Sequence, residues 1–414
     1  MRIEVVNTGT ELLLGKVVNT HAAYFGQELF KLGLRLRRQI TIPDGDEIRE
    51  ALDESFPRSD VILITGGLGP TDDDVTREVV AARLGRALHR DDGIRESIRE
   101  LFRSRGLRYS ELNDRQAMVP EGAVVLENPN GTAPGLFVPA VDEPRSPHLF
   151  LLPGPPRELK PMFRDQVAPR LVDWRSDEEP LTIWHNFRIY GAGESAIASR
   201  LQAEFDAIDG LEVGYCARLG EVDLRLIGGR DCVERAAALV RDAFHREIMT
   251  ESEDAIEKVI LDLLVERKET VATAESCTGG NIAHTITNAP GASAVFHRGY
   301  VTYSNESKTD ILGVPGEVLA AHGAVSAEAV RAMAGGCLER SGADHAVAVS
   351  GIAGPSGGSE EKPAGTVFVG IASRHEPLFA KRYFLPYERL AFKERVTRLV
   401  LDLLRQRLRG FALD

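Results

Sequence analysis

The stretch TAESCTGG places three side chains that could act as nucleophiles directly before two glycines. A strand-like run, TVATA, leads into it, and the helix-like NIAHTIT follows. A turn from a parallel strand into a helix presents side chains at the sheet edge where α/β folds bind ligands. Ser276 is therefore the candidate nucleophile, with Cys277 and Thr278 as rivals. Gly279 and Gly280 would allow a tight turn, and backbone N–H groups from Cys277 to Gly280 would hold an oxyanion.

A serine nucleophile needs a base, and GYVTYSNESK offers one. The pattern predicts a strand that ends at Tyr303, and Lys308 follows five residues later. A lysine desolvated in a pocket can have its pKa lowered enough to accept a proton. Tyr303 would relay a proton or orient the lysine. The histidines of this region have no motif context.

A third segment, SGIAGPSGGSEEKPAGT, follows the apolar run HAVAVS. Its glycines suit close backbone approach to a phosphate or a sugar. The candidate binding residues in it are Ser350, Gly351, Gly354 and Thr366. Glycine-rich turns after strands are common in α/β folds, so spacing alone leaves a catalytic and a purely structural interpretation open.

A second region of possible chemistry lies near the N-terminus, in ITGGLGPTDDDVTRE. A buried strand ends at Gly66 and Gly67, whose backbone could hold phosphate. Asp72, Asp73 and Asp74 then offer the hard oxygen ligands that Mg²⁺ or a similar cation prefers. The alternative is that these aspartates only favour the start of a helix.

Three segments must position these residues. Strands and helices alternate over residues 1–170 and again over 253–414, which predicts α/β domains with parallel sheets. Residues 171–252 predict a small α+β module, entered through WRSDEEPL, which is typical of a linker.

Composition narrows the class of protein. The chain has 414 residues, a net charge of −12, and four widely spaced cysteines without metal or redox spacing. There is no signal peptide pattern and no apolar run long enough to span a membrane. We expect a cytoplasmic protein with reduced thiols that binds neither nucleic acid nor membrane.

With HGAVS (322–326), the three C-terminal motifs resemble the C-terminal domain of the CinA family, the competence/damage-inducible proteins. The resemblance implies a Ser/Lys amidohydrolase that converts nicotinamide mononucleotide to nicotinate mononucleotide and ammonia without a cofactor. It places the nucleophile at Ser276, the base at Lys308 and the accompanying tyrosine at Tyr303. The late arginine of the family falls on Arg389. Here the sequence departs, because Pro386 and Tyr387 replace a single Gly, so the nearby Lys393 and Arg395 are alternatives for binding the phosphate.

The N-terminal motifs resemble the molybdopterin-binding-like domain of the same family. The resemblance implies an ADP-ribose pyrophosphatase that depends on Mg²⁺ or Co²⁺. It places Asp72 and Asp73, two of the three candidate metal ligands, in the pocket, and Pro153, Gly154 and Pro155 at the rim. The ligand-binding residues that it implies are Thr10, Glu11, Gly66, Gly67, Thr71, Asn128, Gly131, Thr132 and Gly154. His21 stands where the family usually has Asn, which leaves open a domain that only binds a nucleotide or pterin, or only supports a dimer.

The middle segment resembles the KH-like module of the family. A KH domain clamps RNA through a GxxG loop, but the nearest element is GAGES at 191–195. Residues 171–252 hold nine Arg, no Lys and sixteen acidic residues. We therefore expect a spacer or subunit contact rather than RNA binding, and the resemblance implies a homodimer.

Overall fold

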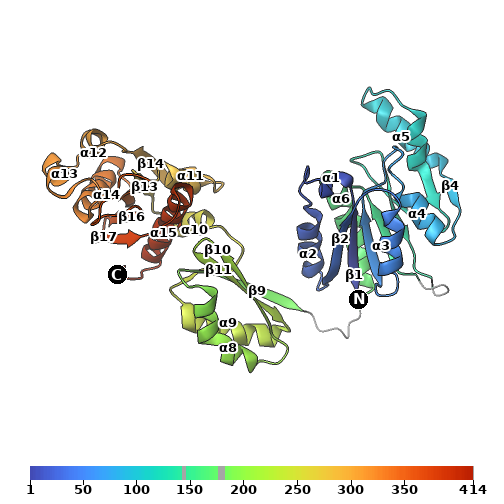
Figure 1. Ribbon diagram of the computed structural model, residues 1–414, viewed down its shortest axis with the longest axis horizontal. Helices are drawn as coiled ribbons and strands as arrows, with labels where there is room; N and C mark the ends of the chain where they lie inside the picture. The colour runs from blue at the N-terminus through green and yellow to red at the C-terminus, as the bar shows by residue number, and fades with distance from the viewer. Residues whose placement is uncertain (142–145, 176–181, 414) are drawn as a thin grey trace. The chain divides into compact units, whose positions relative to one another are not determined.

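The computed structural model describes residues 1–141, 146–175 and 182–413. The chain forms two compact units, Met1–Ile183 and Trp184–Asp414 (Figure 1). Most of the predicted linker WRSDEEPL lies outside the described residues. The middle module and the C-terminal α/β domain belong to the same unit.

The N-terminal unit is built on a six-stranded sheet in the order β2-β1-β3-β8-β7-β6. Its parallel part consists of β2 (Leu36–Ile42), β1 (Ile3–Thr8), β3 (Val61–Thr65) and β8 (His148–Leu152). Antiparallel strands β7 (Gly135–Val138) and β6 (Val124–Leu126) extend it at one edge. β1 and β3 are buried along their whole length, as expected for strands covered on both faces. The predicted parallel α/β fold is confirmed, with an antiparallel edge that the sequence pattern did not indicate.

Helices cover both faces of this sheet. One face packs α2 (His21–Lys31), α6 (Pro156–Met162), a π-helical turn (Phe163–Val167) and α7 (Ala168–Asp173); the other packs α3 (Glu47–Ser55) and α4 (Thr76–Arg83). The remaining elements are α1 (Thr10–Leu13), α5 (Asp92–Ser104), a 3₁₀ turn (Glu111–Ala117) and the pair β4 (Leu88–Arg90) and β5 (Met118–Pro120). Leu171 of α7 is fully buried in this core, so the unit extends through α7.

The middle module is a four-stranded sheet in the order β10-β11-β9-β12 with two helices. The elements in chain order are β9 (Ile183–Tyr190), α8 (Glu194–Asp206), β10 (Glu212–Arg218), β11 (Glu221–Gly228), α9 (Arg230–Phe244) and β12 (Ile248–Thr250). This agrees with the α+β pattern predicted for the segment.

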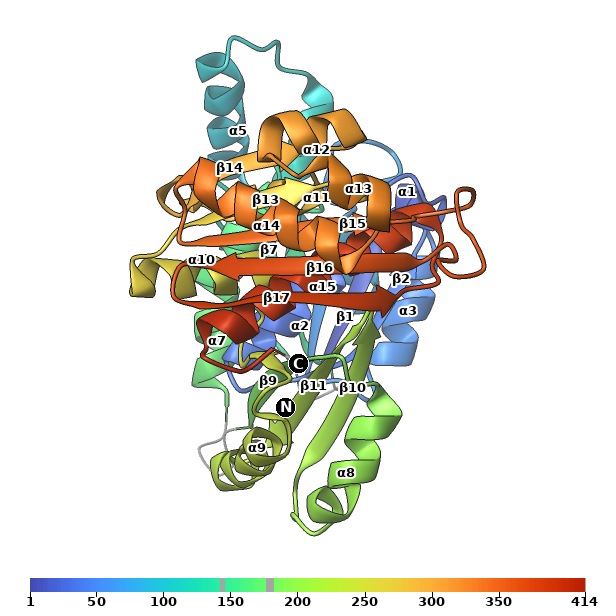
Figure 2. The ribbon, with the colours of Figure 1, turned by 90° about the vertical axis from the view of Figure 1, so that its left-hand side faces the viewer.

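The C-terminal domain has a five-stranded sheet in the order β14-β13-β15-β16-β17. β14 (Phe296–Val301), β13 (Val271–Glu275) and β15 (His345–Gly351) are parallel, whereas β16 (Thr366–Ser373) and β17 (Glu376–Phe384) are antiparallel. One face packs α10 (Ile256–Arg267), α11 (Asn281–Thr287) and α15 (Arg389–Leu408). The other packs α14 (Ala327–Ser341), with α12 (Asn305–Leu312) and α13 (Gly316–His322) beside it (Figure 2). A 3₁₀ turn (Ala292–Ala294) precedes β14.

Helix α15 also fastens the middle module to this domain. Arg398 pairs with the buried carboxylate of Glu221 at 2.8 Å. The fully buried Arg405 donates to the carbonyls of Arg246 and Ile248. Helix α15 therefore begins beside the candidate site described below, and its later turns are bonded to the middle module.

Candidate active site

The nucleophile turn connects β13 to α11. Its position is fixed because the Ser276 N–H donates to the Val349 carbonyl at 3.1 Å, which ties it to the neighbouring strand β15. Gly279 and Gly280 both have positive φ, 61° and 98°, a conformation that side chains disfavour. The predicted strand–turn–helix is therefore present, and the helix begins at Asn281.

Lys308 meets Ser276 in the buried interior of this turn. Its Nζ lies 3.2 Å from Ser276 Oγ and also contacts the carbonyls of Thr302, Tyr303 and Ser304 at 2.9, 3.2 and 3.4 Å. Strand β14 ends at Val301, two residues earlier than predicted, because Ser304 already caps α12. Only 1% of Lys308 is exposed, and burial lowers the pKa of its ammonium below the ordinary range. The structure thus brings together a serine and a lysine whose pKa is lowered by burial.

Glu275 is a residue of this site that the sequence reasoning missed. It is fully buried, immediately before the nucleophile. Its carboxylate accepts hydrogen bonds from the Thr278 hydroxyl (2.7 Å) and from three backbone N–H groups (2.8–3.0 Å), those of Gly280, Ile282 and Ala283. The anion therefore occupies the N-terminus of α11 and fixes the turn around Ser276.

This arrangement corrects the predicted set of oxyanion donors. The Gly280 N–H is taken by Glu275, and the Gly279 N–H donates to the Ser276 carbonyl at 3.0 Å. Within the described residues, the N–H groups of Cys277 and Thr278 have no carbonyl partner. These two N–H groups, which also contact the Cys277 thiol, are the remaining candidates for oxyanion donors; the glycines serve the turn itself.

Cys277 faces the apolar core, where it packs with α10 and α15. Burial, reinforced by the charge of Glu275, raises the pKa of its thiol to about 12. The thiolate is the reactive form of cysteine, so this residue is inert near neutral pH. Of the two neighbouring candidates, Cys277 therefore fits a packed core residue and not a nucleophile.

We expect Glu275→Gln to damage both stability and catalysis. An amide supplies one acceptor oxygen where four donors now converge, and its NH₂ would face a backbone N–H. Leaving such groups unpaired costs about 1–3 kcal/mol, measurable by urea unfolding. We expect the kcat of a reaction that uses Ser276 as nucleophile to fall by about tenfold or more, because Ser276 moves. Thr278→Val, which removes a single donor, is the milder control; equal effects of both changes would contradict this role.

Tyr303 and Arg389 lie at the entrance to the site. Arg389, the first residue of α15, donates to the Tyr303 hydroxyl and to the Gly354 carbonyl, both at 3.1 Å. Tyr303 is 61% exposed, and the part of it that contacts Lys308 is its backbone carbonyl. The predicted orientation of the lysine is therefore carried out by the backbone, while the phenol joins Arg389 at the surface.

Buried residues at both ends of the glycine-rich loop between β15 and β16 fix its position. The buried Ser350 hydroxyl donates to the Ala324 carbonyl at 2.6 Å, and Thr366 is fully buried. A Cβ on Gly351 would lie 2.8 Å from the Thr366 carbonyl oxygen. Ser350, Gly351 and Thr366, which were predicted to bind substrate, therefore support the loop. The fourth predicted residue of this loop, Gly354, accepts a hydrogen bond from Arg389 at the entrance to the site.

The N-terminal unit has a separate pocket of about 400 Å³ at the carboxyl ends of its parallel strands. It is lined by several predicted residues: Glu11, Gly66, Gly67, Asp73, Asp74, Thr132, Pro153, Gly154 and Pro155. Asn128 and Gly131 lie beside it, where Asn128 donates to Glu158, another lining residue, at 2.8 Å. Thr10 bonds Asp44 at the same rim.

Two contacts shape the glycine turn of this pocket. Thr76 Oγ1 donates to the Gly66 carbonyl at 3.0 Å. Arg77 is almost fully buried and donates to the carbonyls of Leu68 and Gly69 at 2.8 and 3.0 Å. Neither residue was selected from the sequence, although both lie in the VTRE that ends the quoted motif.

The three predicted metal ligands do not converge in the structure. Asp72 is fully exposed and pairs with Arg115 at 3.0 Å, whereas Asp74 accepts hydrogen bonds from the Thr71 N–H and hydroxyl. Among the described residues, no three His, Cys, Asp or Glu side chains are grouped to hold a metal ion. As arranged, these side chains do not fit a divalent cation.

His21 lies beneath the pocket and is not one of its lining residues. It is 8% exposed, and its Nδ1 lies 3.3 Å from Asn7 Oδ1 and 3.2 Å from Thr65 Oγ1. Burial lowers the pKa of its imidazole, against an opposing contact with the Gly154 backbone. The residue that departs from the family pattern therefore supports the pocket floor.

We predict that His21 makes the N-terminal unit sensitive to acid. Its folded pKa lies below the unfolded value of about 6.5, so stability is full above that value and is lost as pH falls through the folded pKa. His21→Asn should reduce the fall in Tm between pH 7.5 and 5. Trp174 fluorescence in a Trp184→Phe background would report this unit alone. An equal fall in Tm in wild type and in His21→Asn would contradict the prediction. Any fall in Tm that remains in His21→Asn is assigned to His148, whose pKa is also lowered by burial.

Fold and site together define a two-unit α/β protein with a buried serine–lysine pair at the end of a parallel sheet. Residues 253–408 match the model of the CinA C-terminal domain, and residues 4–173 match a "Probable molybdopterin binding domain". A CinA-like protein of Akkermansia muciniphila is 47% identical over 402 residues, 97% of this chain and 96% of the relative. The chain belongs to the CinA family.

A second relative that matches along its whole length agrees with this assignment. A CinA-like protein of Kosmotoga olearia is 36% identical over 416 residues, covering 99% of both chains. A crystal structure of a CinA superfamily protein from Klebsiella pneumoniae is 35% identical and matches 38% of this chain and 97% of its own, with a TM-score of 0.37.

None of the helices in the described ranges is long and apolar enough to cross a membrane.

Proposed function

We propose that the C-terminal domain hydrolyses the carboxamide of nicotinamide mononucleotide, giving nicotinate mononucleotide and ammonia. The observation that carries the proposal is the 3.2 Å contact between Ser276 Oγ and the buried Lys308 Nζ. A nucleophile within hydrogen-bond reach of a base with a lowered pKa is the arrangement that acyl transfer requires. The CinA family resemblance supplies the substrate.

The reaction follows from this geometry in two halves. Ser276 Oγ forms a bond to the carboxamide carbon while its proton passes to neutral Lys308. The N–H groups of Cys277 and Thr278 stabilise the oxyanion, and Lys308 returns the proton to the amide nitrogen as the C–N bond breaks and ammonia leaves. Water then attacks the acyl-serine, gives a proton to Lys308, and releases the carboxylate as Ser276 regains its proton.

Ammonia release from nicotinamide mononucleotide, coupled to glutamate dehydrogenase, tests the proposal. We expect turnover that EDTA leaves unchanged, with nicotinate mononucleotide identified by mass. Absence of turnover by the folded protein would overturn it. Free nicotinamide should be a poor substrate because it lacks the ribose phosphate.

We propose as a second function that the N-terminal pocket binds a nucleoside diphosphate such as ADP-ribose. The 400 Å³ pocket that Gly66 and Gly67 line supports this, because glycines let a ligand approach the backbone closely; the Gly66 N–H itself donates to the Leu152 carbonyl. The carboxylates around it do not form a metal site as arranged, so hydrolysis is the less supported step. ADP-ribose titration, followed by assays with Mg²⁺ and Co²⁺, separates binding from AMP release; absence of binding would exclude both.

A further inference from the structure

Three cations near the start of α15 are candidates to bind the phosphate of a mononucleotide: Arg389, Lys393 and Arg395. Arg395 is directed at the middle module. Its Nη1 donates to the Leu219 carbonyl at 3.0 Å, and its guanidinium lies over the rings of Tyr190 and Tyr387. These contacts give Arg395 a structural role.

Arg389 bridges the two sides of the entrance. One guanidinium nitrogen bonds the Tyr303 hydroxyl and the other bonds the Gly354 carbonyl. These two contacts set the plane of the guanidinium, because an arginine side chain is a rigid fork. The geometry suits a clamp on the neighbouring loops.

Lys393 lies one helical turn after Arg389 and is half-buried. Within the described residues its ammonium has no hydrogen-bond or ion-pair partner; only its backbone carbonyl is used, by Thr397. The Nζ lies 3.6 Å from where a Cβ on Gly279 would be, beside the nucleophile turn. A partly desolvated ammonium without a counter-charge is costly, so an anion is the ligand that would relieve it.

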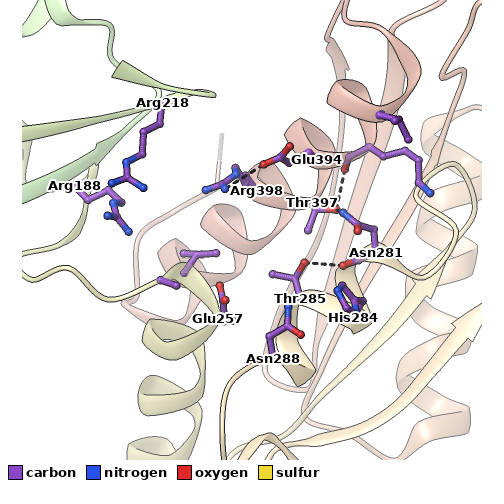
Figure 3. Close-up of a pocket in the computed structure, with 14 residues that line it drawn as sticks. Arg188, Arg218, Glu257, Asn281, His284, Thr285, Asn288, Glu394, Thr397 and Arg398 are labelled. Atoms are coloured by element: carbon purple, nitrogen blue, oxygen red, sulfur yellow. Dashed lines mark hydrogen bonds and ion pairs between the residues drawn. The ribbon is translucent and has the colours of Figure 1, made fainter. Parts of the chain in front are cut away.

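A pocket with polar walls lies next to Lys393. Lys393 lines a pocket of about 480 Å³ together with one polar face of α11, which presents Asn281, His284, Thr285 and Asn288 (Figure 3). Asn281 donates to Thr397 Oγ1 at 2.9 Å, which closes the wall between α11 and α15. At the far side, Arg188 and Arg218 share Asp223, and Arg398 is bound by Glu221 and Glu394. Residues 276–280 do not line this pocket; Lys393 is the lining residue whose ammonium lies beside that turn, and among the described residues it is the lining cation without a partner.

We propose that Lys393 binds the phosphate of the mononucleotide and thereby makes the enzyme select a nucleotide over the corresponding nucleoside. This rests on the proposed deamidase. The carboxamide and phosphate are separated by a pyridine ring and a ribose, so a phosphate site beside the turn, rather than on Ser276, is what the substrate requires. Gly279 is required by the turn itself, where its φ is 61°; a Cβ there would lie in van der Waals contact with Lys393 Nζ, which shows how close the ammonium is to the turn.

The test compares nicotinamide mononucleotide with nicotinamide riboside, which lacks the phosphate. In Lys393→Met we expect KM for the nucleotide to rise about 10–100-fold, as for loss of a charge-assisted hydrogen bond. Its kcat should stay within about threefold, and kcat/KM for the riboside should not change. Lys393→Arg should restore most of the selectivity. Lys258→Met, which removes an exposed lysine paired with Asp262 on α10, is the matched control.

The outcomes separate this inference from the proposed function. If wild-type protein turns over the nucleotide but Lys393→Met retains full selectivity, the inference is wrong and the deamidase stands. Equal losses for both substrates would show a structural role and also overturn it, as would Arg389→Lys losing selectivity while Lys393→Met does not. If wild type shows no turnover, the binding of both compounds is measured by calorimetry instead. Tighter binding of the nucleotide that disappears in Lys393→Met would support phosphate binding by Lys393 without the deamidase reaction. Equal binding of the two compounds by wild type would overturn the inference.

Discussion

Replacing Ser276 by Ala should lower the kcat of ammonia release from nicotinamide mononucleotide by about 10⁴-fold or more. The variant lacks the only hydroxyl within hydrogen-bond distance of Lys308 Nζ among the described side chains. Removal of a nucleophile that works together with its base has effects of this size in serine hydrolases. Substrate binding should persist, since the hydroxyl is small, and calorimetry with the variant would measure it.

Cys277→Ala is the matched control, one residue further along the same turn. It removes a buried thiol that packs in the core, so we expect at most about a 2 kcal/mol loss of stability and nearly unchanged kcat. If instead Cys277→Ala abolished turnover and Ser276→Ala did not, the nucleophile would be the thiol. The raised pKa of that thiol argues against this outcome, because a nucleophilic cysteine needs its thiolate.

Residue types and spacing predicted that Ser276 and Lys308 lie at one candidate site, although they left a purely structural interpretation of that site open. The run TVATA followed by two glycines defines a strand and a turn, and the lysine of the next βα connection faces the same sheet edge. Parallel strands end together, so residues distant in sequence, such as Ser276 and Lys308, meet there.

The partners of each backbone group could not be predicted in this way. Glu275 precedes the nucleophile in the motif, yet only the fold shows that its carboxylate takes the Gly280 amide, which had been expected to hold an oxyanion, together with the amides of Ile282 and Ala283. Likewise, Tyr303 contacts Lys308 through a carbonyl, which residue type does not indicate. Hydrogen-bond assignment depends on three-dimensional register rather than on composition.

The aspartate run shows a different limit. Three consecutive acidic residues at a turn point in different directions, so their number does not predict a shared ligand. Asp72 pairs with Arg115 outside the pocket, while Asp74 closes a local turn with Thr71. Neither interpretation matches this geometry: no side chain among the described residues caps α4, which begins at Thr76, and the aspartates instead make contacts within and beside the preceding loop.

Replacing Lys308 by Arg should lower kcat/KM by about 10³-fold, although it keeps a positive charge. A guanidinium remains protonated at every accessible pH and cannot accept the proton of Ser276. Lys308→Met should be equally inactive. Activity of Lys308→Arg close to wild type would show that the residue acts through its charge and not as a base; circular dichroism would establish that both variants are folded.

The pH profile of the wild-type enzyme is a second test of Lys308 as the general base. Catalysis requires neutral Lys308, so kcat/KM should rise with pH through a pKa below the 10.5 of an ordinary lysine and then level off. The cause is burial, which disfavours the ammonium even though three carbonyls surround Nζ. A neutral amine has two N–H groups to donate to carbonyls and one lone pair, which then faces the Ser276 hydroxyl. The residual activity of Lys308→Met should lack this rising limb; if the limb remained, the titrating base would be another group.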